Sequence, residues 1–150
     1  MSMIETVRAA RAQRDWSRLV EAVPFARFLD LRLDIKGDEF TCILPYKDKL
    51  IGNPVLPALH GGATGGFMEC AAIFYLLWHR ESTTVPKTID LNFEYLRSGR
   101  PQHTYADVYM VKLGSRVANV RVEAWQSSPD KQIAVAHGNF LLRPEAQHHV

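Results

Sequence analysis

Cysteine is scarce in this chain: its 150 residues include two, Cys42 and Cys70. Two cysteines make no disulfide framework, and such usage is typical of a reducing compartment. An excess of one charge sign is lacking too, since 18 lysines and arginines stand against 16 acidic residues. The sequence also has no RNP-type, Cys/His or basic-helix signature, so we expect no nucleic acid partner.

A targeting segment and a membrane span are lacking as well. The N-terminus, MSMIETVRAARAQRDW, has no apolar stretch of the kind that signal peptides need, so the cytoplasm is the expected location. The stretch from Gly61 to Trp78 has 18 residues with a single charge, so it just reaches the length of a membrane-spanning helix. Four glycines and the central Glu69 make this segment a poor span. We therefore expect a helix buried in the protein and no membrane partner.

What is present is an ordinary globular composition, 47% hydrophobic and 23% charged, in a length that suits one domain over residues 1–150. Ser2 and Glu5 have the spacing of a capping box, and apolar residues then recur at helical intervals until Pro24. This pattern predicts a surface helix over residues 1–23.

The other periodicities predict one long helix among strands. Residues 28–36 and 40–44 alternate apolar and polar side chains around a Gly37-Asp38 turn, as a hairpin does. A loop rich in proline, glycine and asparagine follows, and the helix is expected from about residue 59 to residue 80. Three or four antiparallel strands come after it. In the first, TIDLNFEYL, one face carries Ile89, Leu91, Phe93 and Tyr95, and the other carries Thr88, Asp90, Asn92 and Glu94.

This order of elements predicts an α+β fold in which one antiparallel sheet wraps around one helix. The free edge and the outer face of such a sheet need protection. A homodimer that continues the sheet would provide it.

The four glycines of the helix call for an explanation, because each lowers helix stability by about 1 kcal/mol relative to alanine. Close packing against the sheet is one explanation, which suits Gly65 and Gly66. Gly61 and Gly62 lie in the first turn, where backbone N–H groups have no partner within the helix and the dipole is positive. Since no side chains shield these N–H groups, we predict an anion or oxyanion site at Gly61 and Gly62.

Glu69 lies in the middle of the apolar helix. A buried carboxylate is costly unless it is paired or functional, so Glu69 has either a structural partner or a role as general base or nucleophile. It follows Gly61 by eight positions, which is about 12 Å along a helix. A reacting carbonyl must lie about 3 Å from both groups, so one chain cannot easily supply both. Two antiparallel copies of the helix could, which predicts a site at a dimer interface.

The run LHGGATGGFME, in which HGG precedes an acidic residue by nine positions, resembles the hotdog-fold acyl-CoA thioesterases of the phenylacetate-degradation (PaaI-like) family. The stretches TIDLNFEYLRSG, YADVYMVKLGSRVANVRVEAW and IAVAHGNFLL resemble that family's strands, and the likeness covers roughly residues 25 to 143. The resemblance implies a hotdog fold, hydrolysis of an acyl-CoA without a cofactor, and a homodimer or a dimer of dimers.

The resemblance also implies residue roles. Glu69 occupies the position of the family's nucleophile or general base, and the N–H of Gly61 that of the donor to the thioester carbonyl. Asn53 would help to position the leaving group or water. Thr88, which opens the strand after the helix, would orient water. The roles of Asn53 and Thr88 rest on the resemblance alone.

Other residues have competing interpretations. His60 either contacts the substrate or holds the glycine turn as a neutral imidazole, because a cation is disfavoured at a helix N-terminus. Cys70 lacks basic surroundings, so we expect no catalytic thiolate, and the histidines lack metal-ligand spacing, so we expect no metal. Several surface cations could bind CoA phosphates, with Arg116 the best candidate; the others are Arg97, Arg100 and Lys112.

The sequence thus predicts a hotdog thioesterase that hydrolyses a small or medium acyl-CoA. Two alternatives stay open. One is a hotdog enoyl-CoA hydratase or dehydratase that uses Glu69 and His60. The other is a non-catalytic acyl-CoA-binding module on the same fold.

Overall fold

The computed structural model describes residues 2–80 and 84–143. Its N-terminal segment contains three helices where the sequence predicts one over residues 1–23: α1 (Met3–Gln13), α2 (Ser17–Ala22) and α3 (Pro24–Phe28). The capping box of Ser2 and Glu5 is present. The helix ends early because Arg14 takes a left-handed conformation, with φ of 52°. Pro24 begins α3 instead of ending a helix, since its missing N–H is no loss at a first helical position.

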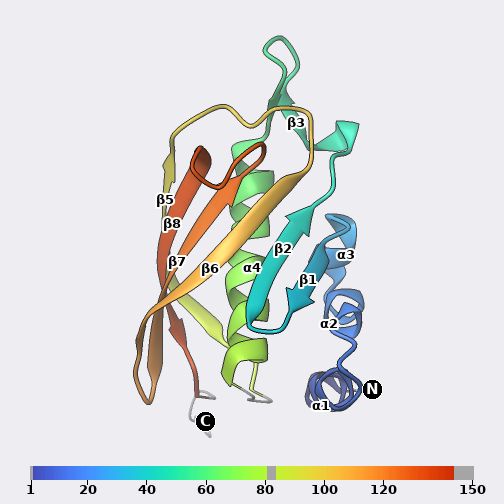
Figure 1. The fold of residues 1–150 in the computed structure, drawn as a ribbon, viewed down its shortest axis with the longest axis vertical. Helices are drawn as coiled ribbons and strands as arrows, with labels where there is room; N and C mark the ends of the chain where they lie inside the picture. The colour runs from blue at the N-terminus through green and yellow to red at the C-terminus, as the bar shows by residue number, and fades with distance from the viewer. Residues whose placement is uncertain (1, 81–83, 144–150) are drawn as a thin grey trace, which may run out of the picture.

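The predicted hairpin is confirmed as β1 (Arg32–Lys36) and β2 (Glu39–Leu44), which pair in antiparallel register. The predicted loop after it has structure of its own. It contains a short 3-10 helix, η1 (Asp48–Leu50), and a two-stranded hairpin of β3 (Ile51–Asn53) and β4 (Ala58–Leu59). In Figure 1 this small hairpin projects beyond the start of the long helix.

The main sheet has six strands in the antiparallel order β1-β2-β6-β7-β8-β5. Its last four strands along the chain are β5 (Lys87–Tyr95), β6 (Thr104–Leu113), β7 (Val117–Trp125) and β8 (Gln132–Leu141). The edges of this sheet are therefore β1 and β5. The α+β class and the sheet wrapped around one helix are confirmed (Figure 1).

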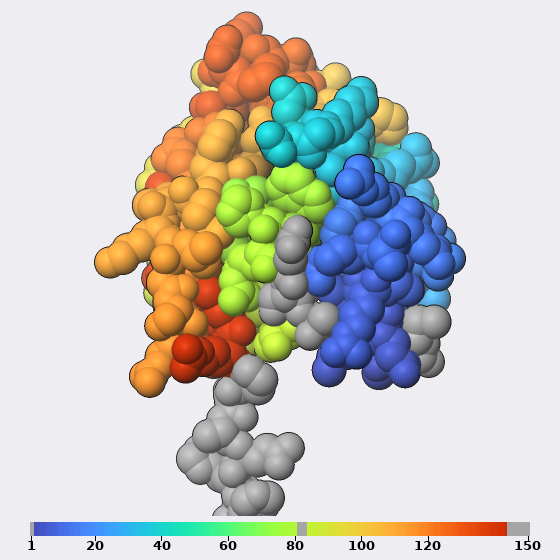
Figure 2. Space-filling model, turned by 60° about the horizontal axis from the view of Figure 1, so that its bottom comes forward, coloured from blue at the N-terminus to red at the C-terminus, as the bar shows by residue number. Residues whose placement is uncertain are grey.

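The long helix α4 (Gly61–Arg80) lies against one face of the sheet and supplies the largest core side chains. Phe67 and Leu76 are fully buried. The facing positions of the sheet are small, which lets helix and sheet approach closely; they include Ala106, Ala118, Ala124, Ala134 and Ala136, all without exposed surface. Seen from the end at which α4 terminates, the helix lies between the N-terminal helices and the strands β6 and β7 (Figure 2).

One face of α4 is not fully covered within the protomer. Gly62, Gly66, Glu69 and Ile73 follow one another at intervals of four, three and four residues, so they share one side of the helix, and each keeps some exposed surface. We call these residues the open face of α4. Beside them the edge strand β5 exposes about half of an isoleucine, Ile89. The protomer therefore leaves a helix face and a strand edge open beside each other.

Candidate active site

His60 fixes the first turn of α4. Its carbonyl accepts hydrogen bonds from the N–H groups of Ala63 and Thr64, and its Nδ1 accepts one from the Gly62 N–H at 2.9 Å. A side-chain acceptor on the second helical N–H is the bond that a helix N-cap makes. The structure thus places His60 as a cap with an unprotonated Nδ1. Of the two glycine N–H groups expected to be bare, that of Gly62 is occupied.

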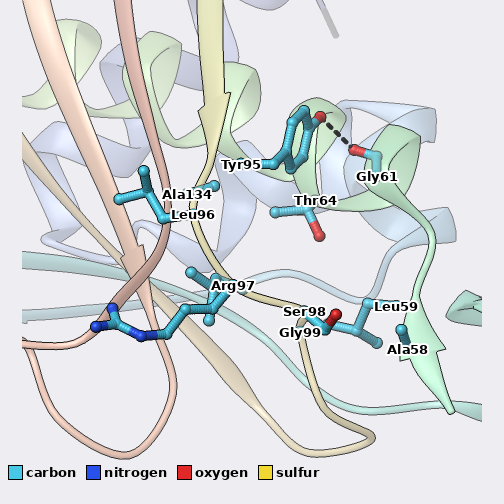
Figure 3. A pocket seen from close by; sticks show the side chains of 11 residues that line it. Ala58, Leu59, Gly61, Thr64, Tyr95, Leu96, Arg97, Ser98, Gly99 and Ala134 are labelled. Carbon is cyan, nitrogen blue, oxygen red and sulfur yellow. Dashed lines mark hydrogen bonds between the residues drawn. The ribbon is translucent and has the colours of Figure 1, made fainter. Parts of the chain in front are cut away.

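Gly61 is the first residue of α4, so its N–H has no partner within the helix. It lines a pocket of about 440 Å³ with Thr64, Tyr95 and the loop that follows β5 (Figure 3). The Tyr95 hydroxyl donates a hydrogen bond to the Gly61 carbonyl at 2.7 Å. This bond holds the turn from its carbonyl side, while the N–H remains available to a ligand oxygen.

Glu69 and Thr88 lie together in a second pocket, of about 460 Å³. The helix contributes Gly62, Gly65 and Gly66 to its wall, and β5 contributes a row of apolar side chains: Ile89, Leu91, Phe93 and Tyr95. Within residues 2–80 and 84–143, no lysine or arginine forms an ion pair with Glu69. A structural partner therefore does not explain this carboxylate in the described part of the chain. Gly61 and Glu69 line different pockets of one protomer.

Thr88 faces this pocket because of a β-bulge. Thr88 pairs with Phe140 and Asp90 pairs with Asn139, so Ile89 is an extra residue in β5. The strict alternation predicted from the sequence, with Thr88 facing away from Leu91, is wrong because the extra residue turns Thr88 to the helix side. The Asp90 carboxylate holds the bulge, since its Oδ1 accepts hydrogen bonds from the Asn139 backbone N–H and from Nδ2, at 3.1 and 3.0 Å.

The glycines of the second turn allow close packing, as the sequence suggested, but with two different neighbours. A Cβ at Gly65 would lie 3.2 Å from the Tyr95 hydroxyl, on the sheet side. A Cβ at Gly66 would lie 2.8 Å from the Phe25 ring, which belongs to α3 and not to the sheet. Sequence reasoning named neither aromatic residue as part of the site. For Tyr95 the alternation of β5 carried the signal, whereas nothing in the sequence pattern pointed to Phe25.

Two predicted site residues lie apart from these pockets. The Asn53 side chain turns back on its own loop, where its Oδ1 accepts hydrogen bonds from the N–H groups of Val55 and Leu56 at 2.9 and 3.3 Å. Arg116 belongs to the turn between β6 and β7, which lies at the end of the molecule where α4 terminates (Figure 1). Gly61 is at the other end of that helix. The structure therefore brings together Glu69, Thr88 and Gly62, and leaves Asn53 and Arg116 elsewhere in the protomer.

The remaining chemistry of the site is simple. Burial, assisted by the charge of Glu69, raises the pKa of the Cys70 thiol to about 11, so this group stays protonated near neutral pH. No group of three or more histidine, cysteine and acidic residues in the described part of the chain could hold a metal ion. Among the same residues, no helix has the length and apolar character that crossing a membrane requires.

Comparison with known proteins assigns this chain to a family. The sequence profile of the thioesterase superfamily matches residues 56–133, which is more than half of the chain. The medium/long-chain acyl-CoA thioesterase YigI of Escherichia coli K12 is 30% identical over 135 residues, which cover 80% of this chain and 86% of YigI. The chain belongs to the thioesterase superfamily and is a thioester hydrolase.

Solved structures share the fold of this chain. A protein from Chromobacterium violaceum is 36% identical, with a TM-score of 0.77 over 95% of this chain and 99% of that one. A phenylacetic acid degradation-related protein from Ralstonia eutropha JMP134 has a TM-score of 0.72 at 21% identity, over 85% and 98% of the two chains, which shows the fold alone. The hotdog fold and the hotdog thioesterase family expected from the sequence are confirmed.

Proposed function

We propose that this thioesterase hydrolyses acyl-CoA in a site shared by two protomers, which combines Glu69 of one chain with Gly61 of the other. One observation carries the proposal. Glu69 shares a pocket with Thr88 on the open face of α4, whereas Gly61 begins the same helix about 12 Å away and lines another pocket. A thioester carbonyl has to meet both groups at about 3 Å, which two antiparallel copies of α4 permit.

The proposed dimer places two β5 edges side by side and lays the open faces of α4 against each other. It would cover Ile89, which is 54% exposed in the protomer. It would also remove the unpaired backbone groups at the β5 edge, which is a common way of protecting such an edge. A pair of such dimers is compatible with this arrangement, since the outer face of the sheet stays free.

In the proposed mechanism the Gly61 N–H donates a hydrogen bond to the thioester carbonyl oxygen and stabilises the charge that develops there. Glu69 of the partner subunit either attacks the carbonyl carbon or takes a proton from the attacking water. The C–S bond then breaks, and CoA leaves as the thiol after taking up a proton. Where Glu69 has attacked, water then hydrolyses the anhydride formed with Glu69, and by either route the acyl group leaves as the carboxylate. Thr88 orients the water. The role of Asn53, whose amide Nδ2 can still donate, is to steady the water or the leaving group.

The acyl group is proposed to lie along the apolar side chains of β5. Leu91 and Phe93 line the Glu69 pocket and offer a hydrophobic wall to a hydrocarbon chain. We expected a small or medium acyl group from the sequence, and the relative YigI is named for medium and long chains. A medium-length acyl-CoA is the class that these two expectations share, and it is the one we propose.

Two substitutions test the shared site by complementation. Glu69→Gln removes the carboxylate charge at constant shape. Gly61→Pro removes the N–H, and proline suits a first helical position. A Cβ at Gly61 meets Tyr95 ring atoms at 3.5 Å, an ordinary contact, so the helix should form. We expect each variant alone to lose at least about 100-fold in thiol release from octanoyl-CoA, with an unchanged circular dichroism spectrum.

When the two variants are unfolded together and refolded, half of the dimers are mixed and one of their two sites is intact. The shared site therefore predicts recovery of about a quarter of the wild-type activity. No recovery from a well-folded mixture would contradict the shared site. Glu69→Gln with most of its activity would contradict the catalytic role. Absorbance change with an enoyl-CoA without thiol release would favour the hydratase, and thermal stabilisation by acyl-CoA without turnover would favour the binding module.

A further inference from the structure

The loop between β5 and β6 carries two arginines beside the Gly61 pocket. Arg97 and Ser98 line that pocket, and they also line a neighbouring cavity of about 330 Å³. The other walls of this second cavity are Arg100 and the tip of the β3–β4 hairpin, Leu56 and Pro57. Because the two cavities share Arg97 and Ser98, a ligand can extend from Gly61 past Ser98 toward both arginines. In Figure 3 the Arg97 side chain extends away from Gly61 and Thr64.

The backbone of this loop is fixed before any ligand binds. The N–H groups of Leu96 and Arg97 both donate to the Ile133 carbonyl, at 2.8 and 3.1 Å. The Gln126 side chain holds Arg100 from both sides, since it accepts from the Arg100 N–H and donates to the Arg100 carbonyl, each at 2.9 Å. The arginines therefore project from a rigid base, and little backbone entropy is lost when they bind a ligand.

Both guanidinium groups have donors to spare. Arg97 donates one N–H to the Gln132 carbonyl at 2.9 Å, and a guanidinium has five. Arg100 has an exposed side chain. Within residues 2–80 and 84–143 neither arginine takes part in an ion pair. Two unneutralised, forked donors next to each other are suited to phosphate groups, which arginine binds in bidentate fashion.

We propose that Arg97 and Arg100 bind the phosphates of the CoA nucleotide, while the pantetheine arm lies past Ser98 and the thioester reaches Gly61. The inference rests on the proposed function and adds the element that recognises the leaving group. It makes a nucleotide thioester the substrate, in preference to a thioester whose pantetheine carries no phosphate. It assigns the phosphates to arginines of the protomer that supplies Gly61, whereas Arg116, the cation expected from the sequence, lies at the opposite end of that protomer.

The main test is Arg100→Gln, because this side chain is exposed and makes no hydrogen bond or ion pair with residues 2–80 and 84–143. Thiol release is measured with octanoyl-CoA and with octanoyl-pantetheine, which lacks the phosphates. We expect the wild type to prefer octanoyl-CoA, and Arg100→Gln to raise its KM about tenfold with kcat kept, while octanoyl-pantetheine is hydrolysed as before. Arg100→Lys keeps one charge and should give an intermediate KM. Arg97→Gln should act in the same direction, with its melting temperature as the check on folding.

Arg8→Gln is the matched control, since Arg8 is exposed on α1, far from the start of α4 (Figure 1). Arg8→Gln should leave the KM for octanoyl-CoA and the KM for octanoyl-pantetheine unchanged. We expect the same of Arg116→Gln. The proposal is overturned if Arg100→Gln changes the KM for both thioesters equally or changes neither KM. It is also overturned if Arg116→Gln alone raises the KM for octanoyl-CoA. Calorimetry with free CoA and free pantetheine measures the contribution of the phosphates to binding without turnover. If the wild type releases no thiol from any substrate, the proposed function fails, while a CoA affinity lowered by Arg100→Gln still supports the phosphate site.

Discussion

At the scale of single residues, the site depends on how the first turn of α4 distributes its N–H groups. His60 takes the Gly62 N–H, and this leaves the Gly61 N–H for the substrate. The residue pattern kept two roles open for His60 and treated both glycine N–H groups alike, while the resemblance singled out Gly61 as the donor. The pattern could not separate the two N–H groups, because whether an imidazole reaches back to its own helix depends on its rotamer.

The cap interpretation makes a specific prediction for His60. Asparagine is a strong N-cap residue, so His60→Asn should keep both stability and activity. His60→Leu should lose about 1 kcal/mol of unfolding free energy, which corresponds to about 2–4 °C in melting temperature for a chain of this size. Thermal melts and thiol release on both variants check this. If His60→Asn melts like the wild type but is inactive, His60 contacts the substrate and the cap is not its main role.

At the scale of the elements, α4 and the main strands could be predicted, because each has a long and clean hydrophobic period. The N-terminal helix was predicted as one element because the apolar spacing continues across Arg14, where the left-handed conformation leaves no trace in that spacing. The face of Thr88 could not be predicted for a similar reason. A bulge adds one residue without breaking the alternation of residue types, so the periodicity turned Thr88 away from the helix, whereas the structure places Thr88 in the Glu69 pocket.

The bulge in β5 therefore deserves its own test. Asp90→Ala removes both hydrogen bonds to Asn139, so Thr88 should lose its fixed direction and kcat should fall about tenfold. Thr88→Val should cost a similar factor. Both changes act through the same side chain. The kcat of the double variant should therefore be no lower than that of the less active single variant. The measurements are thiol release and urea unfolding; factors that simply multiply would show that Asp90 acts by another route.

At the scale of the whole molecule, the open face of α4 and the β5 edge are expected to meet a second copy. Ile89 and Ile4 provide a matched pair, since they are 54% and 48% exposed and belong to different elements, β5 and α1. Ile89→Glu should separate the protomers by placing a charge from each chain in the interface, and activity should fall with it. Ile4→Glu should change neither the association of the protomers nor the activity. Sedimentation velocity and thiol release decide; an active, monomeric Ile89→Glu protein would refute the shared site.

The continuity of α4 has a consequence for how such a dimer works. Gly61 and Glu69 belong to one unbroken helix, yet they serve two different sites. Each α4 is then a rigid rod between the sites, and an axial shift of about 1.5 Å, the rise of one residue, displaces the donor of one site and the carboxylate of the other together. The two sites are mechanically coupled. A contact that moves either helix, even at its far end beside α1, changes both reaction centres at once.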